Sequence, residues 1–274
     1  MAYLDEDIVP TNDSFYATKA YAKDMVSVLK CLLGKDKTRN CSMIITNEGI
    51  HLVIDEKSSM QWHAYFKRHV FIDFDVRVDT IEIRLPLHDL IEAVNALSPT
   101  AKVELRYGSE GSPFTISVEH ENTKLDVSIK TFNPLNVLSY EFDDNILAKV
   151  SLLPKTIKDV IRDIDSASQT VRFKITEDEF EVSYGNEVMT STTTFPSYSG
   201  EVCEFIVNQE LISFHYKSAV IKRLLPALRM TKKVCFRIDE RGVLNVQLPI
   251  PEQDVGSNFV QVYLLPNLED YEIL

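Results

Sequence analysis

Residues 154–164 have the sequence PKTIKDVIRDI, in which a proline opens the stretch and apolar residues recur at positions 157, 160, 161 and 164. A proline is tolerated at the first helical position because the N–H that it lacks would have no intrahelical partner. The spacing of the apolar residues is that of one helix face. The stretch therefore predicts a short amphipathic helix that packs one side against a core.

Three other stretches show the same pattern, at nearly even intervals along the chain. They are residues 22–33 (AKDMVSVLKCLL), 88–97 (HDLIEAVNAL) and 218–230 (SAVIKRLLPALRM). The four stretches begin at residues 22, 88, 154 and 218, which indicates an internal repeat. Pro226 lies inside the last stretch, where we expect it to kink or shorten the helix.

Each helical stretch is followed by residues that alternate between apolar and polar, as in a β-hairpin. These hairpin segments are CSMIITNEGIHLVID (41–55), KVELRYGSEGSPFTISVE (102–119), TVRFKITEDEFEVSY (170–184) and KVCFRIDERGVLNVQL (233–248). A strand-like run also precedes each helix. The repeated unit is therefore strand, helix and further strands, which predicts an α+β fold dominated by antiparallel sheets.

Two consecutive units form a domain of ordinary size, so the chain is expected to contain two similar domains. Residues 133–145 (NPLNVLSYEFDDN) show no helical pattern and have a proline near their start. We predict a first domain at residues 1–132, a connector at 133–146 and a second domain at 147–274.

The 274-residue chain has a formal net charge of -12, which by itself argues against a nucleic-acid-binding protein. Residues 211–238 contain no Asp or Glu and are strongly basic, through Lys217, Lys222, Arg223, Arg229, Lys232, Lys233 and Arg237. This stretch is either a phosphate-facing surface on a repelling body or an ordinary solvated helix face.

The remaining composition narrows the class of protein. The four cysteines form no CxxC pair and no zinc spacing, so we expect reduced thiols and no metal. No apolar run is long enough to cross a bilayer, and the acidic N-terminus is not a secretory signal. No cofactor motif occurs, and we expect neither a cofactor nor a membrane partner.

Several stretches together resemble the Rad-one subunit family of the nine-one-one checkpoint clamp, within the sliding-clamp superfamily. They are TNEGIHLVIDE (46–56), MQWHAYFKRHVFIDF (60–74), SIKTFNP (128–134), FRIDERGVLNVQ (236–247) and FVQVYLLP (259–266). The family pattern in the second stretch corresponds to Gln61, Ala64, Tyr65, Phe71 and Phe74.

This resemblance implies two clamp domains whose helices line the lumen of a ring. It implies a non-catalytic nuclear subunit in a heterotrimer with two related chains, of the Rad-nine and Hus-one type. A clamp loader would place the ring around duplex DNA at damaged or stalled sites, where the ring recruits checkpoint and repair proteins. The chain extends only to Leu274 after Pro266, so we expect it to lack the long phosphorylatable tail of the Rad-nine subunit.

In that fold, basic residues on or beside the helices should contact DNA phosphates. The predicted DNA-facing residues are Lys23, Lys30, Lys155, Lys158, Arg162, Lys217, Lys222, Arg223 and Arg229. The second helical stretch departs from this pattern, because it carries Asp89 and Glu92. We expect that helix to contribute little to phosphate contact.

The resemblance also implies two contact regions for proteins. For the ring interface these are Leu125, Val127 and Ile129 in one strand, and Met189, Thr190, Thr192 and Thr194 in another. The second strand is uncharged, as expected of a paired edge, although an internal strand with a polar face would look the same. For a partner groove beside the connector they are Val137, Leu138, Tyr140 and Phe142, which could instead anchor the connector to its own domain.

Two other functions have to be weighed. Asp73 and Asp75 would lie on one face of a strand with Asp79 nearby, and clustered carboxylates serve metal-dependent 3′–5′ exonucleases. No supporting set of carboxylates has a recognisable spacing, so we do not expect catalysis. A protein-only adaptor with a clamp fold is the other alternative, and the direction in which the helical Lys and Arg residues face would distinguish it.

Overall fold

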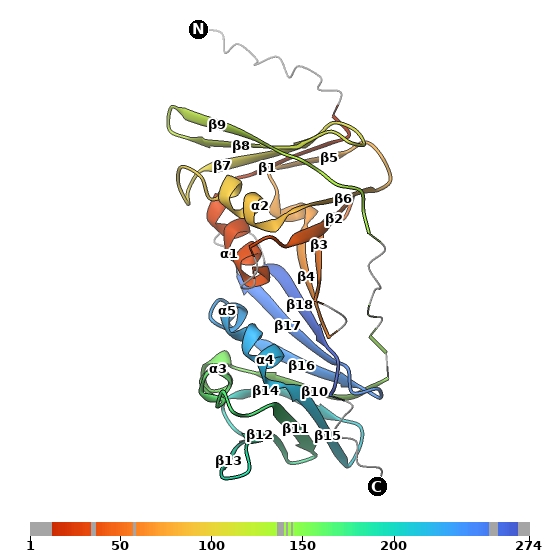
Figure 1. Cartoon of the computed structure of the whole chain (residues 1–274), viewed down its shortest axis with the longest axis vertical. Coiled ribbons are helices and arrows are strands. Elements are labelled where there is room, and N and C mark those ends of the chain that lie inside the picture. The colour runs from red at the N-terminus through yellow and green to blue at the C-terminus, as the bar shows by residue number, and fades with distance from the viewer. Residues whose placement is uncertain are drawn as a thin grey trace.

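The computed structural model describes residues 13–33, 37–56, 59–135, 140, 142–143, 145–251 and 257–267. Within them the chain forms four successive units of strand, helix and three strands, and the first and third units each end with one further short strand (Figure 1). The α+β class and the fourfold repeat predicted from the sequence are confirmed.

The first two units make up the N-terminal half. Their elements are β1 (Phe15–Lys19), α1 (Ala22–Leu32), β2 (Asn40–Thr46), β3 (Gly49–Glu56), β4 (Met60–Lys67), a 3₁₀ turn η1 (Arg68–Val70), β5 (Asp73–Val76), β6 (Ile81–Pro86), α2 (Leu87–Val94), β7 (Lys102–Tyr107), β8 (Phe114–His120) and β9 (Thr123–Ile129).

The last two units make up the C-terminal half. Their elements are β10 (Ile146–Leu152), α3 (Pro154–Asp163), β11 (Thr170–Thr176), β12 (Glu179–Gly185), β13 (Thr190–Pro196), β14 (Val202–Val207), β15 (Leu211–Lys217), α4 (Ser218–Ile221), a 3₁₀ turn η2 (Lys222–Leu224), α5 (Leu225–Leu228), β16 (Val234–Asp239), β17 (Leu244–Pro251) and β18 (Ser257–Leu264).

The interruption predicted at Pro226 is confirmed: over residues 218–230 the fourth helix breaks into α4, η2 and α5, because Pro226 has no N–H for an intrahelical bond and its ring crowds the preceding turn. The second helix ends at Val94 instead of Leu97, and Leu97 itself takes a left-handed backbone with φ 62°. A residue in that region cannot continue a right-handed helix.

The strands form three antiparallel sheets. A five-stranded sheet has the order β5-β1-β7-β8-β9, and a four-stranded sheet has the order β13-β12-β11-β15. Between them runs a nine-stranded sheet with the order β14-β10-β16-β17-β18-β4-β3-β2-β6. The pairing of β18 with β4 joins the two halves into this one sheet, from Phe259 opposite Tyr65 to Leu264 opposite Met60.

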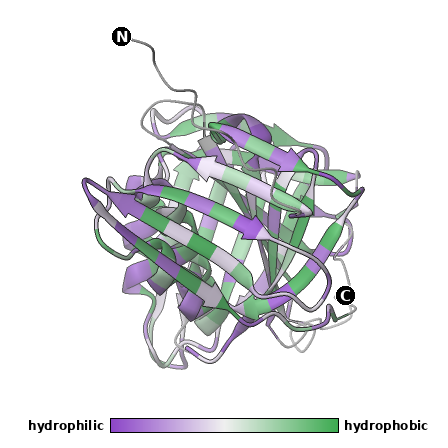
Figure 2. Ribbon diagram, turned by 90° about the horizontal axis from the view of Figure 1, so that it is seen from above, coloured by the Kyte–Doolittle hydropathy of each residue, from purple (hydrophilic) through white to green (hydrophobic). Residues whose placement is uncertain are grey.

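In strand β2 of the nine-stranded sheet, the side chains divide between a buried face and a half-buried face. Along β2 the burial alternates, with Cys41, Met43 and Ile45 inside the core and the residues between them only half-buried. Hydrophobic and hydrophilic residues alternate along the strands in Figure 2 as this period requires. We call the half-buried side the outward face of the sheet.

The helices gather on one side of the molecule, while residues 130–135 leave β9 and run down the opposite side (Figure 1). Helix α1 contacts β4 and β18, and it also contacts α5 of the other half. Among the helices that the structure describes, none combines the length and hydrophobicity needed to cross a bilayer.

Phe173 joins the two sheets of the C-terminal half, and we predict that Phe173→Ala lowers the free energy of unfolding by about 3–5 kcal/mol. The ring is fully buried and meets the rings of Phe180, Tyr216 and Phe236 edge-on at 5.3, 5.4 and 5.8 Å. Chemical denaturation measures the change, with Tyr198→Ala as the control because that side chain is 89% exposed. Equal losses from the two substitutions would contradict this account of the core.

Candidate nucleic-acid and ring-contact surfaces

The basic residues predicted to face DNA come from every helical region except α2. Lys23 and Lys30 belong to α1, and Lys155, Lys158 and Arg162 belong to α3. The remaining four lie at or beside the broken fourth helix: Lys217, Lys222, Arg223 and Arg229. All nine side chains are exposed or half-buried, on elements that share one side of the molecule (Figure 1).

Two of these nine cations are already engaged in ion pairs. Arg162 binds Asp159 at 2.8 Å and Asp163 at 2.9 Å, so its charge is largely balanced on α3 itself. Arg223 forms an ion pair with Glu56. Helix α2 presents the exposed Asp89 and Glu92, which leaves it the acidic member that its sequence indicates.

The ion pair of Arg223 belongs to a bridge between the halves that sequence analysis did not find. Glu56 at the end of β3 accepts from Arg39 at 2.5 Å through one oxygen and from Arg223 through the other. The Arg223 guanidinium also lies 5.9 Å from the centre of the buried Trp62 ring. Burial, and then the charge of Arg39, lower the pKa of Arg223 to about 10, so the group stays charged at neutral pH.

The predicted ring-interface residues lie on strands at the ends of two different sheets, except Met189, which directly precedes β13 and does not lie within it as predicted. In the part of the chain that the structure describes, β9 pairs only with β8 and β13 pairs only with β12. Leu125 is 38% exposed and Met189 is 52% exposed, whereas Ile129 is buried and offers only its backbone to a neighbour. The topology thus excludes the alternative that residues 190–196 form an internal strand.

The connector residues that can be placed lie on the outward face of the nine-stranded sheet. The Tyr140 N–H donates to Gln61 Oε1 on β4 at 3.4 Å. The Phe142 ring lies 4.7 Å from the Arg237 guanidinium and 6.3 Å from the Tyr263 ring. These contacts favour the anchoring role for Phe142. Val137 and Leu138 lie outside the described residues.

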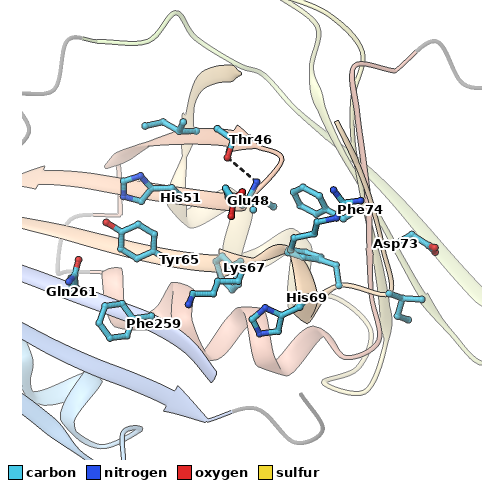
Figure 3. A pocket seen from close by; sticks show the side chains of 17 residues that line it. Thr46, Glu48, His51, Tyr65, Lys67, His69, Asp73, Phe74, Phe259 and Gln261 are labelled. Atoms are coloured by element: carbon cyan, nitrogen blue, oxygen red, sulfur yellow. Dashed lines mark hydrogen bonds between the residues drawn. The ribbon is translucent and has the colours of Figure 1, made fainter. Parts of the chain in front are cut away.

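An open cavity of about 1170 Å³ lies on the same outward face, over β2, β3, β4 and β18 (Figure 3). Its walls are mixed, with Tyr65 and Phe259 on one side and Lys67 and His69 on another. The His51 ring stacks on Tyr65 with the ring centres 4.3 Å apart. Such a wall can hold a partner side chain.

His51 in the wall of this cavity is hydrogen-bonded to a second histidine, His63. His51 Nε2 lies 2.9 Å from His63 Nδ1, and His63 Nε2 lies 2.7 Å from Gln61 Oε1. Because the amide oxygen can only accept, His63 Nε2 carries a proton and its Nδ1 accepts from His51. Burial lowers the pKa of His51 to about 4, and burial together with the neighbouring His51 lowers the pKa of His63 to about 3.

Sequence analysis did not find this pair of histidines. Their positions in β3 and β4 place both on the outward face, but only the register of the two strands brings the rings together: Val53, not His51, lies directly opposite His63. Alternation along each strand could have predicted the shared face, and nothing local predicts the diagonal contact.

The carboxylates considered for an exonuclease do not form a metal site. Asp73 and Asp75 are exposed on β5, and Asp75 pairs with Arg77 at 3.2 Å. Across the described ranges no three His, Cys, Asp or Glu side chains are arranged to hold a metal ion. The four cysteines are free thiols.

Comparisons with known proteins agree with this geometry. The family described as "Repair protein Rad1/Rec1/Rad17" matches residues 14–250. The chain is 24% identical to "Cell cycle checkpoint protein RAD1 homolog mrt-2" of Caenorhabditis elegans, over 92% of this chain and 94% of that protein. It is 23% identical to "Cell cycle checkpoint protein RAD1" of Homo sapiens, over 98% of each chain.

The fold has a counterpart among solved structures. The crystal structure of Proliferating Cellular Nuclear Antigen from Entamoeba histolytica superposes with a TM-score of 0.77, covering 93% of this chain and 99% of that chain. The two sequences are only 13% identical, so this likeness establishes the fold, which is that of a sliding clamp.

The histidine pair predicts that the protein loses stability as the pH falls from about 7.5 to 5.5. Unfolded histidines take up protons near their ordinary pKa of 6.5, whereas His51 and His63 stay neutral in the folded chain down to about pH 4. Their stabilising contribution is therefore complete above pH 6.5 and declines below it, by roughly 1 to 3 kcal/mol at pH 5.5.

Urea unfolding at several pH values measures this decline. His51→Phe keeps a ring against Tyr65 but removes one titrating group, so its stability should depend less on pH. His69→Phe is the matched control, because His69 is exposed. Parallel pH profiles for the unchanged protein and His51→Phe would refute the assignment.

Proposed function

We propose a function from the premise that this chain belongs to the family described as Repair protein Rad1/Rec1/Rad17. With the sliding-clamp fold, membership makes the chain a subunit of a DNA-damage checkpoint clamp. The ring encircles duplex DNA at damaged or stalled sites and recruits checkpoint and repair proteins. The observation that carries this proposal is that the basic residues named above belong to or adjoin helices that share one side of the molecule (Figure 1), in a chain whose net charge is -12.

The basic helical side suits a protein that must hold DNA without fixing its position. Lysine and arginine contacts to phosphate supply affinity but do not distinguish bases. In a closed ring the topology prevents dissociation, so each contact can remain weak enough to break during sliding. The acidic remainder of the chain repels DNA from the outer surface.

The two end strands supply the means of closing a ring. The unpaired edge of a strand at the side of a sheet exposes a row of N–H and C=O groups that readily pairs with another chain. The outer edges of β9 and β13 lie on different halves of the molecule, as head-to-tail contacts require. We assign these edges to two related subunits of the Rad-nine and Hus-one type, with assembly on DNA by a clamp loader in the nucleus.

The subunit is proposed to be non-catalytic. The exposed carboxylates on β5 lack a third ligand in the described structure, so nothing supports the exonuclease alternative. A docking role for the connector groove is part of the proposal, supported by the cavity on the same outward face of the nine-stranded sheet as Tyr140. The alternative of a protein-only adaptor predicts that the helical charges do not affect the salt dependence of DNA binding.

We predict that reversing two helical charges weakens DNA binding by the assembled ring. Lys30→Glu with Lys155→Glu alters exposed cations for which no ion pair is found. Each phosphate contact that is lost should reduce the slope of log affinity against log salt by about 0.9. The measurement is a titration of the ring with duplex DNA at several salt concentrations.

The matched control is Lys67→Glu with Arg68→Glu, which reverses two exposed charges at the outward-facing cavity. That ring should keep the full slope. If the helical variant also keeps the full slope while the ring remains intact, the helices do not contact DNA and the adaptor alternative is favoured.

A second prediction concerns ring assembly. Thr192→Lys places a charge on the exposed edge strand β13, and charged side chains are the usual protection of edges against pairing. The variant should fold normally but assemble with its partner subunits at least tenfold more weakly, as measured by analytical ultracentrifugation. Thr80→Lys, in an exposed loop, is the control. Unchanged assembly of Thr192→Lys would exclude β13 from the interface.

A further inference from the structure

A second cleft, of about 1120 Å³, lies where the two halves meet. Arg39 follows α1 in the N-terminal half, and the opposite wall comes from Lys217, Lys222 and Arg223 in the C-terminal half. Cys31, near the end of α1, also lines the cleft. The cleft therefore lies on the same side of the molecule as the helices (Figure 1). Its walls are therefore rich in cations from both halves.

The cleft also contains two buried hydroxyl groups that have no hydrogen-bond partner. Ser168 is 4% exposed and Ser218 is 5% exposed, and neither Oγ finds an acceptor or donor in the protein. Buried polar atoms in folded proteins nearly always have a partner, which can be a ligand. Two orphaned hydroxyls in the lining of one basic cleft indicate a bound group that offers oxygen acceptors.

Among the described residues that line the cleft, the charges leave a positive excess. Asp165 is the one acidic residue in this described lining, against four cations. Glu56 contacts Arg39 and Arg223 without lining the cleft, so it balances one of these two charges and holds both guanidinium groups in place. Guanidinium groups held in this way lose little conformational freedom when they bind an anion.

We propose that this cleft is a discrete phosphate-binding site at the junction of the two halves. Two guanidinium groups, two ammonium groups and two hydroxyls can donate to the four oxygens of a phosphate group, whereas a carboxylate has only two oxygens. This inference rests on the proposed function and deepens it. The phosphate that the cleft binds in the cell belongs either to the DNA backbone or to a free phosphate-bearing ligand.

The isolated full-length chain provides a direct assay, because Trp62 is its only tryptophan and Arg223 lies against that ring. The probe is inorganic pyrophosphate, titrated at constant ionic strength with chloride as the balancing anion. We expect a saturable change in Trp62 fluorescence. A response no larger than that to chloride would overturn the proposal.

Serine variants separate binding from stability. Ser168→Ala and Ser218→Ala each remove an unpartnered hydroxyl, so thermal unfolding should occur at the same temperature or higher. Pyrophosphate affinity should fall about threefold or more in each variant, and further in Lys222→Gln. Lys232→Gln, an exposed lysine outside the cleft lining, is the control and should bind normally. Unaltered affinity in both serine variants and in Lys222→Gln would refute the site.

The assembled ring then distinguishes the two sources of phosphate. If a DNA phosphate occupies the cleft, pyrophosphate competes with duplex DNA, and the Lys222→Gln ring loses about 0.9 of salt slope. If the isolated chain binds pyrophosphate but the DNA slope is unchanged, the site is supported as one for a free phosphate-bearing ligand. Absence of pyrophosphate binding, with the Lys30 and Lys155 effect retained, would overturn this inference and leave the proposed function standing.

Discussion

The antiparallel pairing of β18 with β4 is the interaction on which the rest of the structure depends. It joins residues from opposite ends of the chain, with Val260 opposite Ala64 and Val262 opposite Trp62. All four of these side chains are fully buried. Because side chains alternate along a strand, a shift of one residue would turn this apolar set outward and bring the polar set into the core. Burial therefore fixes the register, and the register fixes how the two halves face each other.

The two candidate functional surfaces both depend on this pairing of β18 with β4. On the inner side, it brings Glu56 of the N-terminal half to Arg223 of the C-terminal half and forms the basic cleft between them. On the outward side, it places the Tyr263 ring edge-on to His63, with the ring centres 5.0 Å apart, where the connector crosses. Weakening the pairing of β18 with β4 would disturb both surfaces together, whereas substitutions on the edge strands β9 and β13 would leave both surfaces intact.

Local patterns predicted the elements well where their cause is local. The proline at residue 154 begins α3, and Pro226 interrupts the fourth helix, because both act on the chain within one turn. The short strand β14 was not predicted, since it is completed by pairing with the distant strand β10. The histidine pair and the Arg39–Glu56–Arg223 bridge were missed for the same reason.

The sequence by itself determined the fourfold repeat, the α+β class, the basic character of the helices and the acidic character of the remainder, because all of these are recorded in spacing and composition. Only the tertiary structure decided that β9 and β13 end their sheets and that Glu56 engages two of the cations. It also decided that Ser168 and Ser218 meet in one cleft. The physical reason is that strand order and register are set by burying the whole core at once, so contacts between distant residues leave no periodic signal in the chain.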